Sequence, residues 1–215
     1  YRAIERAGDI AAVATGLDLP PHFVIGHSLG GGSGALYAAR NPDTVRAAVL
    51  VEPTPTGPDH WQRVGMFDDD WKPVRETQGR NGWSSIDELR GRLEKNRMTS
   101  TWTPEVLEDV LREETILHED GSISIKWSPS FYNFDELRTD VFSLIDEADS
   151  MTMPVLVMVA ASNNLLESHL KPFAERLPQG EFVAIEGVGH SIYMEDPDLV
   201  AERTRVFFKD RALAD

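Results

Sequence analysis

Residues 23–31 read Phe-Val-Ile-Gly-His-Ser-Leu-Gly-Gly, and this stretch decides the fold. An apolar strand runs directly into the pattern G-x-S-x-G, and small residues at 33–39 predict a helix immediately afterwards. This order is typical of a nucleophile elbow, a strained strand-to-helix turn that lifts the hydroxyl of Ser28 above the edge of a sheet. Glycines are expected at 26 and 30 because a Cβ at either position would clash across the turn. Gly31 is expected to let the helix pack closely.

The sequence around this turn resembles the α/β-hydrolase superfamily, and the resemblance covers nearly all of the chain. Residues 26–31 match the family's elbow. Four further segments match in order: the loop after the elbow helix at 41–45, the penultimate core strand at 154–159, the loop Gly187-Val188-Gly189-His190 that carries the catalytic histidine, and Glu195-Asp196-Pro197 at the start of the last helix.

The resemblance implies an α/β-hydrolase fold, in which a mostly parallel sheet is flanked by helices and carries an inserted, mainly helical cap. Residues 1–53 and 153–215 are expected to form the core, and residues 54–152 the cap. In the family, the helix predicted over 1–16 precedes the fifth strand, so only the C-terminal half of the sheet is expected in this chain. The strand at 22–26 would then be an unpaired apolar edge. For this reason, residues 1–215 expressed alone are expected to aggregate.

Local patterns predict the remaining elements. The core strands are expected at 45–51, 154–159 and 181–185, and a closing helix begins at Asp196-Pro197. Within the cap, three signals stand out: a capping box of Ser85 and Glu88, a helix opened by Thr103-Pro104, and a hairpin around Asp120-Gly121. A third cap helix is expected over 134–145.

Composition limits the possible partners. There are 36 acidic and 21 basic residues, a net charge of −15, which argues against a nucleic acid or an anionic membrane as partner. No residue is cysteine, so a disulfide framework is impossible. No apolar run approaches the ~18 residues of a membrane span. We expect a cytoplasmic protein with a small-molecule partner, and neither metal-ligand spacing nor a phosphate-binding loop indicates a cofactor.

The elbow predicts the nucleophile and one oxyanion donor, and the loop after the last strand predicts the base. Ser28 is the expected nucleophile, and the N–H of Leu29 faces an anion that forms there, as one donor of an oxyanion hole. The second donor belongs to a loop expected upstream of this sequence. His190 is the expected base, because it alone among six histidines follows a predicted last strand. His27 is interpreted as structural or substrate-lining, and the remaining histidines have no partner pattern: His22, His60, His118 and His169.

The acid that should orient the base is less obvious. In most relatives an aspartate follows the strand at 154–159, but Asn163 and Asn164 occupy that place here. An amide cannot stabilise an imidazolium by charge. A second location used in the superfamily, by many thioesterase domains among others, is the end of the strand after the elbow helix, where Glu52 stands 24 residues beyond Ser28. We therefore predict Glu52 as the acid, with Glu167 a distant alternative.

These residues predict a serine hydrolase that cleaves an ester or lactone through an acyl-enzyme. A serine at the elbow argues against haloalkane dehalogenases and epoxide hydrolases, which use a carboxylate there. Aromatic residues of the cap could line an apolar acyl or lactone pocket or pack the cap's own core: Trp61, Trp71, Trp83, Trp102, Trp127, Phe131 and Tyr132. Two alternatives stay open, an acyl thioesterase and a hydrolase-fold protein that binds a ligand with little turnover.

Overall fold

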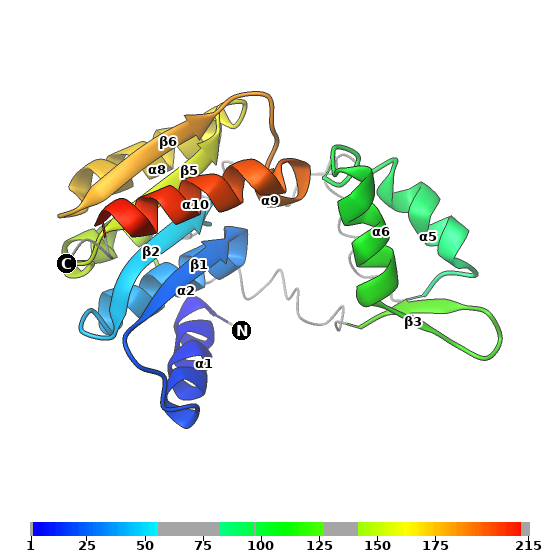
Figure 1. Cartoon of the computed structure of the whole chain (residues 1–215), viewed down its shortest axis with the longest axis horizontal. Helices are drawn as coiled ribbons and strands as arrows, with labels where there is room; N and C mark the ends of the chain where they lie inside the picture. Colours follow the sequence, from blue (N-terminus) through cyan, green and yellow to red (C-terminus); the bar gives the residue numbers. More distant parts are fainter. Residues whose placement is uncertain (1, 56–81, 97, 127–141, 212–215) are drawn as a thin grey trace.

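The computed structural model of the 215-residue chain describes residues 2–55, 82–96, 98–126 and 142–211 (Figure 1). The helices and strands run in this order: α1 Ala3–Gly16, β1 His22–His27, α2 Ser28–Arg40, β2 Val45–Val51, α5 Ile86–Leu93, α6 Pro104–Glu113, β3 Thr115–Leu117, β4 Ile123–Ile125, the 3-10 helix η3 Leu144–Ser150, β5 Val155–Ala160, α8 Asn164–Arg176, β6 Gly180–Ile185, α9 Ile192–Glu195 and α10 Pro197–Arg211.

The core is a four-stranded sheet in the order β1-β2-β5-β6, and every neighbouring pair is parallel. Strands β2 and β5 are almost entirely buried, as expected for central strands with helices on both faces. Successive residues of β2 face two different apolar clusters, one on each side of the sheet. Ala48 and Leu50 face the cluster formed with α1, α2 and α8, whereas Val49 and Val51 face the cluster formed with α10. The predicted α/β class is confirmed.

Most predicted core elements lie where the sequence places them. The helix expected over 1–16 is α1, and the strands expected at 22–26, 45–51, 154–159 and 181–185 are β1, β2, β5 and β6. Helices α8 and α9 are not among the elements that we predict from the sequence. The helix expected over 134–145 falls largely outside the described residues, and the chain enters η3 only at Leu144.

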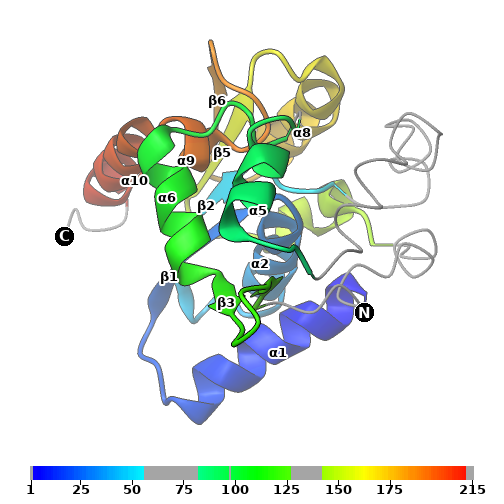
Figure 2. The same ribbon diagram turned by 90° about the vertical axis from the view of Figure 1, so that its right-hand side faces the viewer.

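A second, smaller body contains α5, α6 and the hairpin β3–β4. Its core is formed by Trp83, Leu89, Leu107, Leu111, Ile123 and Ile125. The predicted helix starts are present: the Ser85 hydroxyl accepts a hydrogen bond from Glu88 N–H, and Thr103 accepts one from Val106 N–H. The body lies beyond the carboxyl ends of the sheet strands, in front of β1, β2 and α2 in the rotated view (Figure 2). Thr103 N–H donates to Met194 carbonyl oxygen at 3.1 Å, which joins it to α9.

The glycines of the elbow differ in what they permit. A Cβ on Gly26 would lie 2.7 Å from the carbonyl oxygen of Gly30, so the predicted need for glycine at 26 is confirmed. The same prediction is wrong for Gly30, where a Cβ would meet nothing within 4 Å because this exposed residue points away from the turn. Position 31 is the second one that requires glycine, since a Cβ added there would lie 2.9 Å from Cα of Pro53.

We expect Gly26→Ala to destabilise the protein by about 3 kcal/mol, because the new methyl meets backbone atoms that cannot move independently. Gly30→Ala is the matched control, and replacing a helical glycine in open space should be neutral or stabilise by roughly 0.5–1 kcal/mol. Urea unfolding monitored by circular dichroism measures both. Equal unfolding midpoints for the two variants would contradict this account of the elbow.

Candidate active site

Ser28 stands at the junction of β1 and α2, as the first residue of the helix. Its φ angle is 50°, in the left-handed region that residues with a side chain rarely adopt. Such a conformation costs on the order of 1–3 kcal/mol and persists where the surrounding structure enforces it. Here the close approach of Gly26 to the first turn of α2 enforces it, and the hydroxyl is left half-exposed at the carboxyl edge of the sheet.

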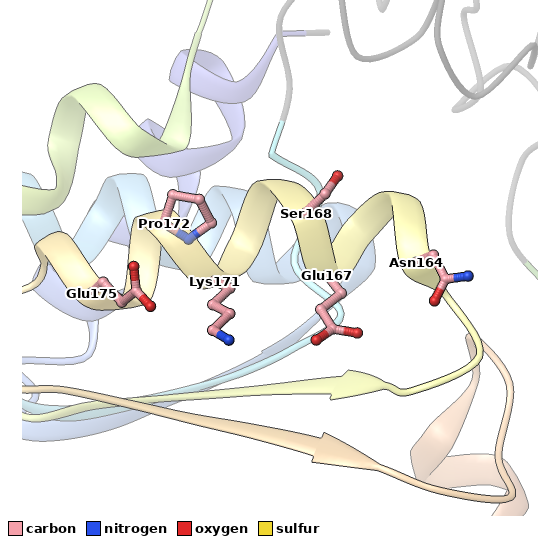
Figure 3. Close-up of a pocket in the computed structure, with 6 residues that line it drawn as sticks. All are labelled: Asn164, Glu167, Ser168, Lys171, Pro172 and Glu175. Carbon is pink, nitrogen blue, oxygen red and sulfur yellow. The ribbon is translucent and has the colours of Figure 1, made fainter.

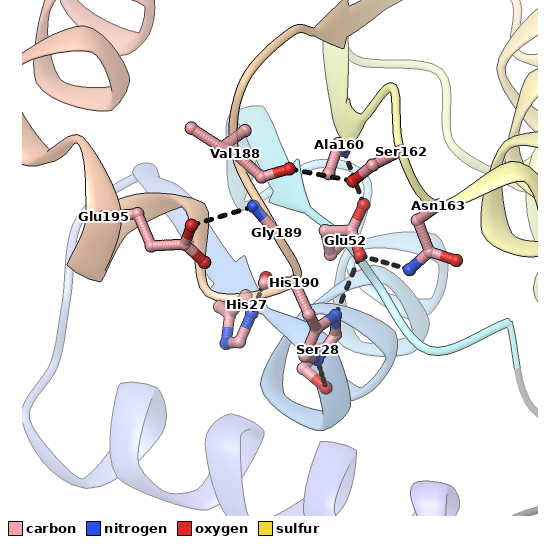
Figure 4. Close-up of polar contacts among 10 residues, drawn as sticks. All are labelled: His27, Ser28, Glu52, Ala160, Ser162, Asn163, Val188, Gly189, His190 and Glu195. Carbon is pink, nitrogen blue, oxygen red and sulfur yellow. Dashed lines mark hydrogen bonds and ion pairs between the residues drawn. The ribbon is translucent and has the colours of Figure 1, made fainter. Parts of the chain in front are cut away.

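His190 reaches Ser28 from the loop that follows β6. Its Nε2 lies 3.0 Å from Ser28 Oγ, and its Nδ1 lies 2.8 Å from Oε2 of Glu52 (Figure 4). Gly187 gives the loop a φ of 79°, which brings the chain back over the sheet edge. A carboxylate only accepts hydrogen bonds, so Nδ1 is the donor toward Glu52. Nε2 of the neutral ring is then free to accept the proton of the Ser28 hydroxyl.

Glu52 is fully buried directly after β2, and it too has a left-handed φ, 47°. Three N–H donors converge on its two carboxylate oxygens. Ala160 N–H donates to Oε1 at 2.6 Å, while Asn163 Nδ2 donates to Oε2 at 2.8 Å beside the bond from His190. Asn163, one of the two asparagines that follow β5 where an aspartate is expected, therefore contacts the carboxylate of Glu52.

Two other residues considered for the acid lie on α8. Asn164 begins this helix, and Glu167 lies one turn further along it. Both line an open surface depression of about 430 Å³ with Ser168, Lys171, Pro172 and Glu175 (Figure 3). None of Ser28, Glu52 and His190 lines this depression, so it is separate from the serine–histidine–glutamate group.

His27 lies immediately before Ser28 and is held close to His190. Its Nε2 is 2.9 Å from the carbonyl oxygen of His190, and the centroids of the two rings are 4.8 Å apart. Burial, and secondly the charge of His190, lower the pKa of His27 to about 4, so its imidazole is neutral at pH 7.

The remaining histidines are held elsewhere. Nε2 of His22 bonds the hydroxyl of Tyr37, and His118 bonds Ser124 on the hairpin. His169 lies on α8 next to Ser168, and His60 is outside the described residues. Among the aromatic residues of the cap, Trp83 packs in the core of the smaller body; Trp61, Trp71, Trp127, Phe131 and Tyr132 also lie outside the described residues.

Leu29 lies in the first turn of α2, where backbone N–H groups have no acceptor within the helix. Its carbonyl oxygen accepts from the hydroxyl of Ser33 at 2.8 Å, and that hydroxyl accepts from Nε of the buried Arg6 at 2.8 Å. This chain of bonds ties the first turn of α2 to α1. It holds Leu29 N–H beside Ser28, at the positive end of the α2 dipole.

In the described part of the chain, no group of three or more histidine, aspartate or glutamate side chains is arranged to hold a metal ion. Among the same residues, no helix is both long and apolar enough to cross a membrane.

A family model for the alpha/beta hydrolase family matches residues 2–203. The chain belongs to the alpha/beta hydrolase family. Its sequence is 20% identical over 198 residues to the mouse (Mus musculus) sn-1-specific diacylglycerol lipase ABHD11, and the match covers 92% of this chain. The chain spans only 61% of the length of that curated relative.

Solved structures of other proteins share the fold. E-2-(acetamidomethylene)succinate hydrolase superposes with a TM-score of 0.78 at 20% identity, over 97% of this hydrolase-family chain and 74% of that protein. The esterase Rv0045c from Mycobacterium tuberculosis superposes with a TM-score of 0.72 at 19% identity, over 97% of this chain and 68% of that protein. At these identities the likeness shows the fold alone.

Proposed function

We propose that the protein is a serine hydrolase that cleaves a carboxylic ester or lactone, with Ser28 as nucleophile, His190 as base and Glu52 as the acid that orients the base. One observation carries the proposal: an unbroken line of contacts from Glu52 Oε2 to His190 Nδ1, at 2.8 Å, and from His190 Nε2 to Ser28 Oγ, at 3.0 Å. Both distances are within hydrogen-bond reach of a proton-transfer step.

In the first step, Ser28 Oγ attacks the acyl carbon while His190 Nε2 takes the hydroxyl proton. The carbonyl π bond opens, and the negative charge on its oxygen faces the N–H of Leu29 at the start of α2. The tetrahedral intermediate then collapses, the bond to the alcohol oxygen breaks, and His190 returns the proton to that oxygen. Glu52 stabilises the imidazolium that exists between the two transfers.

In the second step, a water molecule attacks the acyl group that is bound to Ser28, from the side that the alcohol has left. His190 Nε2 removes a proton from the water as its oxygen bonds to the acyl carbon, and the same proton passes to Ser28 Oγ as the acyl–serine bond breaks. The carboxylic acid leaves and the serine hydroxyl is regenerated. The buried carboxylate of Glu52 holds the same tautomer of His190 through both steps.

We propose that residues 54–152 form a cap over this site, and that the substrate is a medium-sized, apolar acyl compound. The placement of α5 and α6 beyond the carboxyl ends of the strands supports the cap, as does the hydrogen bond from Thr103 to Met194 of α9. An ester as substrate agrees with two of the similar proteins, the diacylglycerol lipase ABHD11 and the esterase Rv0045c.

A substrate panel tests the proposal with the full chain. It contains p-nitrophenyl acetate, butyrate and octanoate, δ-decalactone, and the butyryl thioester of N-acetylcysteamine. We expect kcat/KM to be highest for an oxygen ester or the lactone. A preference for the thioester would instead favour an acyl thioesterase. Binding of these compounds without turnover of any of them would contradict the proposal and favour a ligand-binding protein.

A further inference from the structure

The loop that carries His190 is held by side chains at three consecutive residues (Figure 4). The Ser162 hydroxyl donates to the carbonyl oxygen of Val188, and Gly189 N–H donates to Oε2 of Glu195, both at 2.9 Å. The third contact is the 2.9 Å bond from Nε2 of His27 to the carbonyl oxygen of His190 itself. The backbone is therefore fixed on both sides of the His190 side chain.

The contact from His27 differs from the other two in its origin. Ser162 follows β5 and Glu195 belongs to α9, whereas His27 is the last residue of β1 and the immediate neighbour of Ser28. The bond from His27 therefore ties the end of the strand that precedes the nucleophile to the peptide of His190. The His27 side chain links the turn that carries Ser28 to the loop that carries His190. The separation of these two segments sets the distance from His190 Nε2 to Ser28 Oγ.

The surroundings of His27 favour a fixed, uncharged donor. A carbonyl oxygen only accepts, so Nε2 of His27 carries the proton in this bond. The titratable groups that face the ring are His190, at 4.8 Å between ring centroids, and Tyr193 of α9, also at 4.8 Å. The His27 pKa of about 4 keeps the ring from adding a second positive charge when His190 becomes an imidazolium.

We propose that His27 is a positioning residue of the reaction: its Nε2–H holds the peptide carbonyl of His190, so that the His190 ring stays in line between Glu52 and Ser28. The inference rests on the proposed function. It assigns to the variable residue of the elbow a task that the sequence pattern alone does not indicate. A misplacement of about 1 Å in such a group lowers the rate by roughly 10²-fold.

His27→Phe and His27→Gln test this role, with p-nitrophenyl butyrate as the substrate. Phenylalanine keeps the planar ring and removes the donor, so we expect kcat to fall by roughly 10²-fold with KM little changed. The amide nitrogen of glutamine stands near the position of Nε2 and can donate the same bond, so His27→Gln should stay within about tenfold of the wild type. His22→Phe, at the other end of β1, is the control for loss of a histidine and should keep the wild-type kcat.

A second readout needs no substrate. The proton between His190 Nδ1 and Glu52 should give a low-field resonance in the proton NMR spectrum of the wild type. His27→Phe should broaden or remove this resonance, and His27→Gln should keep it. If His27→Phe does not fold, judged by its urea midpoint, the smaller donor-free His27→Leu takes its place.

Two results would overturn the inference: a donor-free variant with the kcat and resonance of the wild type, or a His27→Gln variant as impaired as His27→Phe. Failure of the proposed function is distinguishable, because the wild type itself would then hydrolyse no ester. The NMR comparison would still report whether His27 holds His190 in place.

Discussion

Ser28→Ala is expected to lower kcat for p-nitrophenyl butyrate by about 10⁶-fold, because no other group can form the acyl-enzyme at this position. Alanine removes a single oxygen, which lies 3.0 Å from His190 Nε2, and leaves Glu52 and His190 in contact. The fold should therefore be unaffected. Steady-state kinetics give the loss of rate, and the urea midpoint of the variant reports on its folding.

Ser168→Ala is the matched control, since it makes the same chemical change on the exposed surface of α8. It should retain the wild-type kcat. A folded Ser28→Ala variant that kept even a tenth of the wild-type rate would rule out Ser28 as the nucleophile.

Glu52→Gln should lower kcat by roughly 10³–10⁴-fold, because an amide does not stabilise the imidazolium by charge. The new amide group also brings two N–H donors to a place already occupied by the donors of Ala160, Asn163 and His190. At least one of these N–H groups then faces the new NH₂ group and has no acceptor, which costs about 1–3 kcal/mol of folding stability. Kinetics at saturating substrate, together with urea unfolding, separate the two effects.

Asn163 provides the control for this second variant. Asn163→Ala removes one hydrogen bond to Glu52 and keeps the charge, so the loss in kcat should be on the order of tenfold. Asn163→Asp in the Glu52→Gln background should recover part of the lost rate, because it restores a carboxylate next to the amide. If Glu52→Gln lost no more activity than Asn163→Ala, the acid would not be Glu52.

The local part of the site could be predicted from the sequence. The turn around Ser28 follows from short-range sterics, since the positions of Gly26 and Gly31 are set by contacts within a few residues or with the adjacent strand end. The loop of His190 is likewise marked by Gly187, whose positive φ a side chain would oppose. The α/β class is implied by the resemblance of the elbow and of four further segments to the superfamily.

Two longer-range contacts, which hold Glu52 and His190 in place, could not be predicted. The bond from Asn163 to Glu52 joins residues 111 positions apart, and the bond from His27 to His190 joins residues 163 positions apart. Whether such side chains meet depends on how the strand ends align in the sheet, and no local pattern encodes it. The sequence could indicate that Asn163 and Asn164 stand where the aspartate is usual, but not that the amide of Asn163 would donate to another acid.

The most direct test of the central claim is to locate the covalent adduct that a fluorophosphonate forms with the full chain. After reaction with an alkyl fluorophosphonate and proteolysis, mass spectrometry should find one phosphonyl group per molecule, on Ser28 in the peptide that contains residues 23–31. His190→Ala should react far more slowly, since the hydroxyl then has no base. A wild-type protein that remains unmodified, or an adduct on a residue other than Ser28, would contradict the Ser28–His190–Glu52 mechanism.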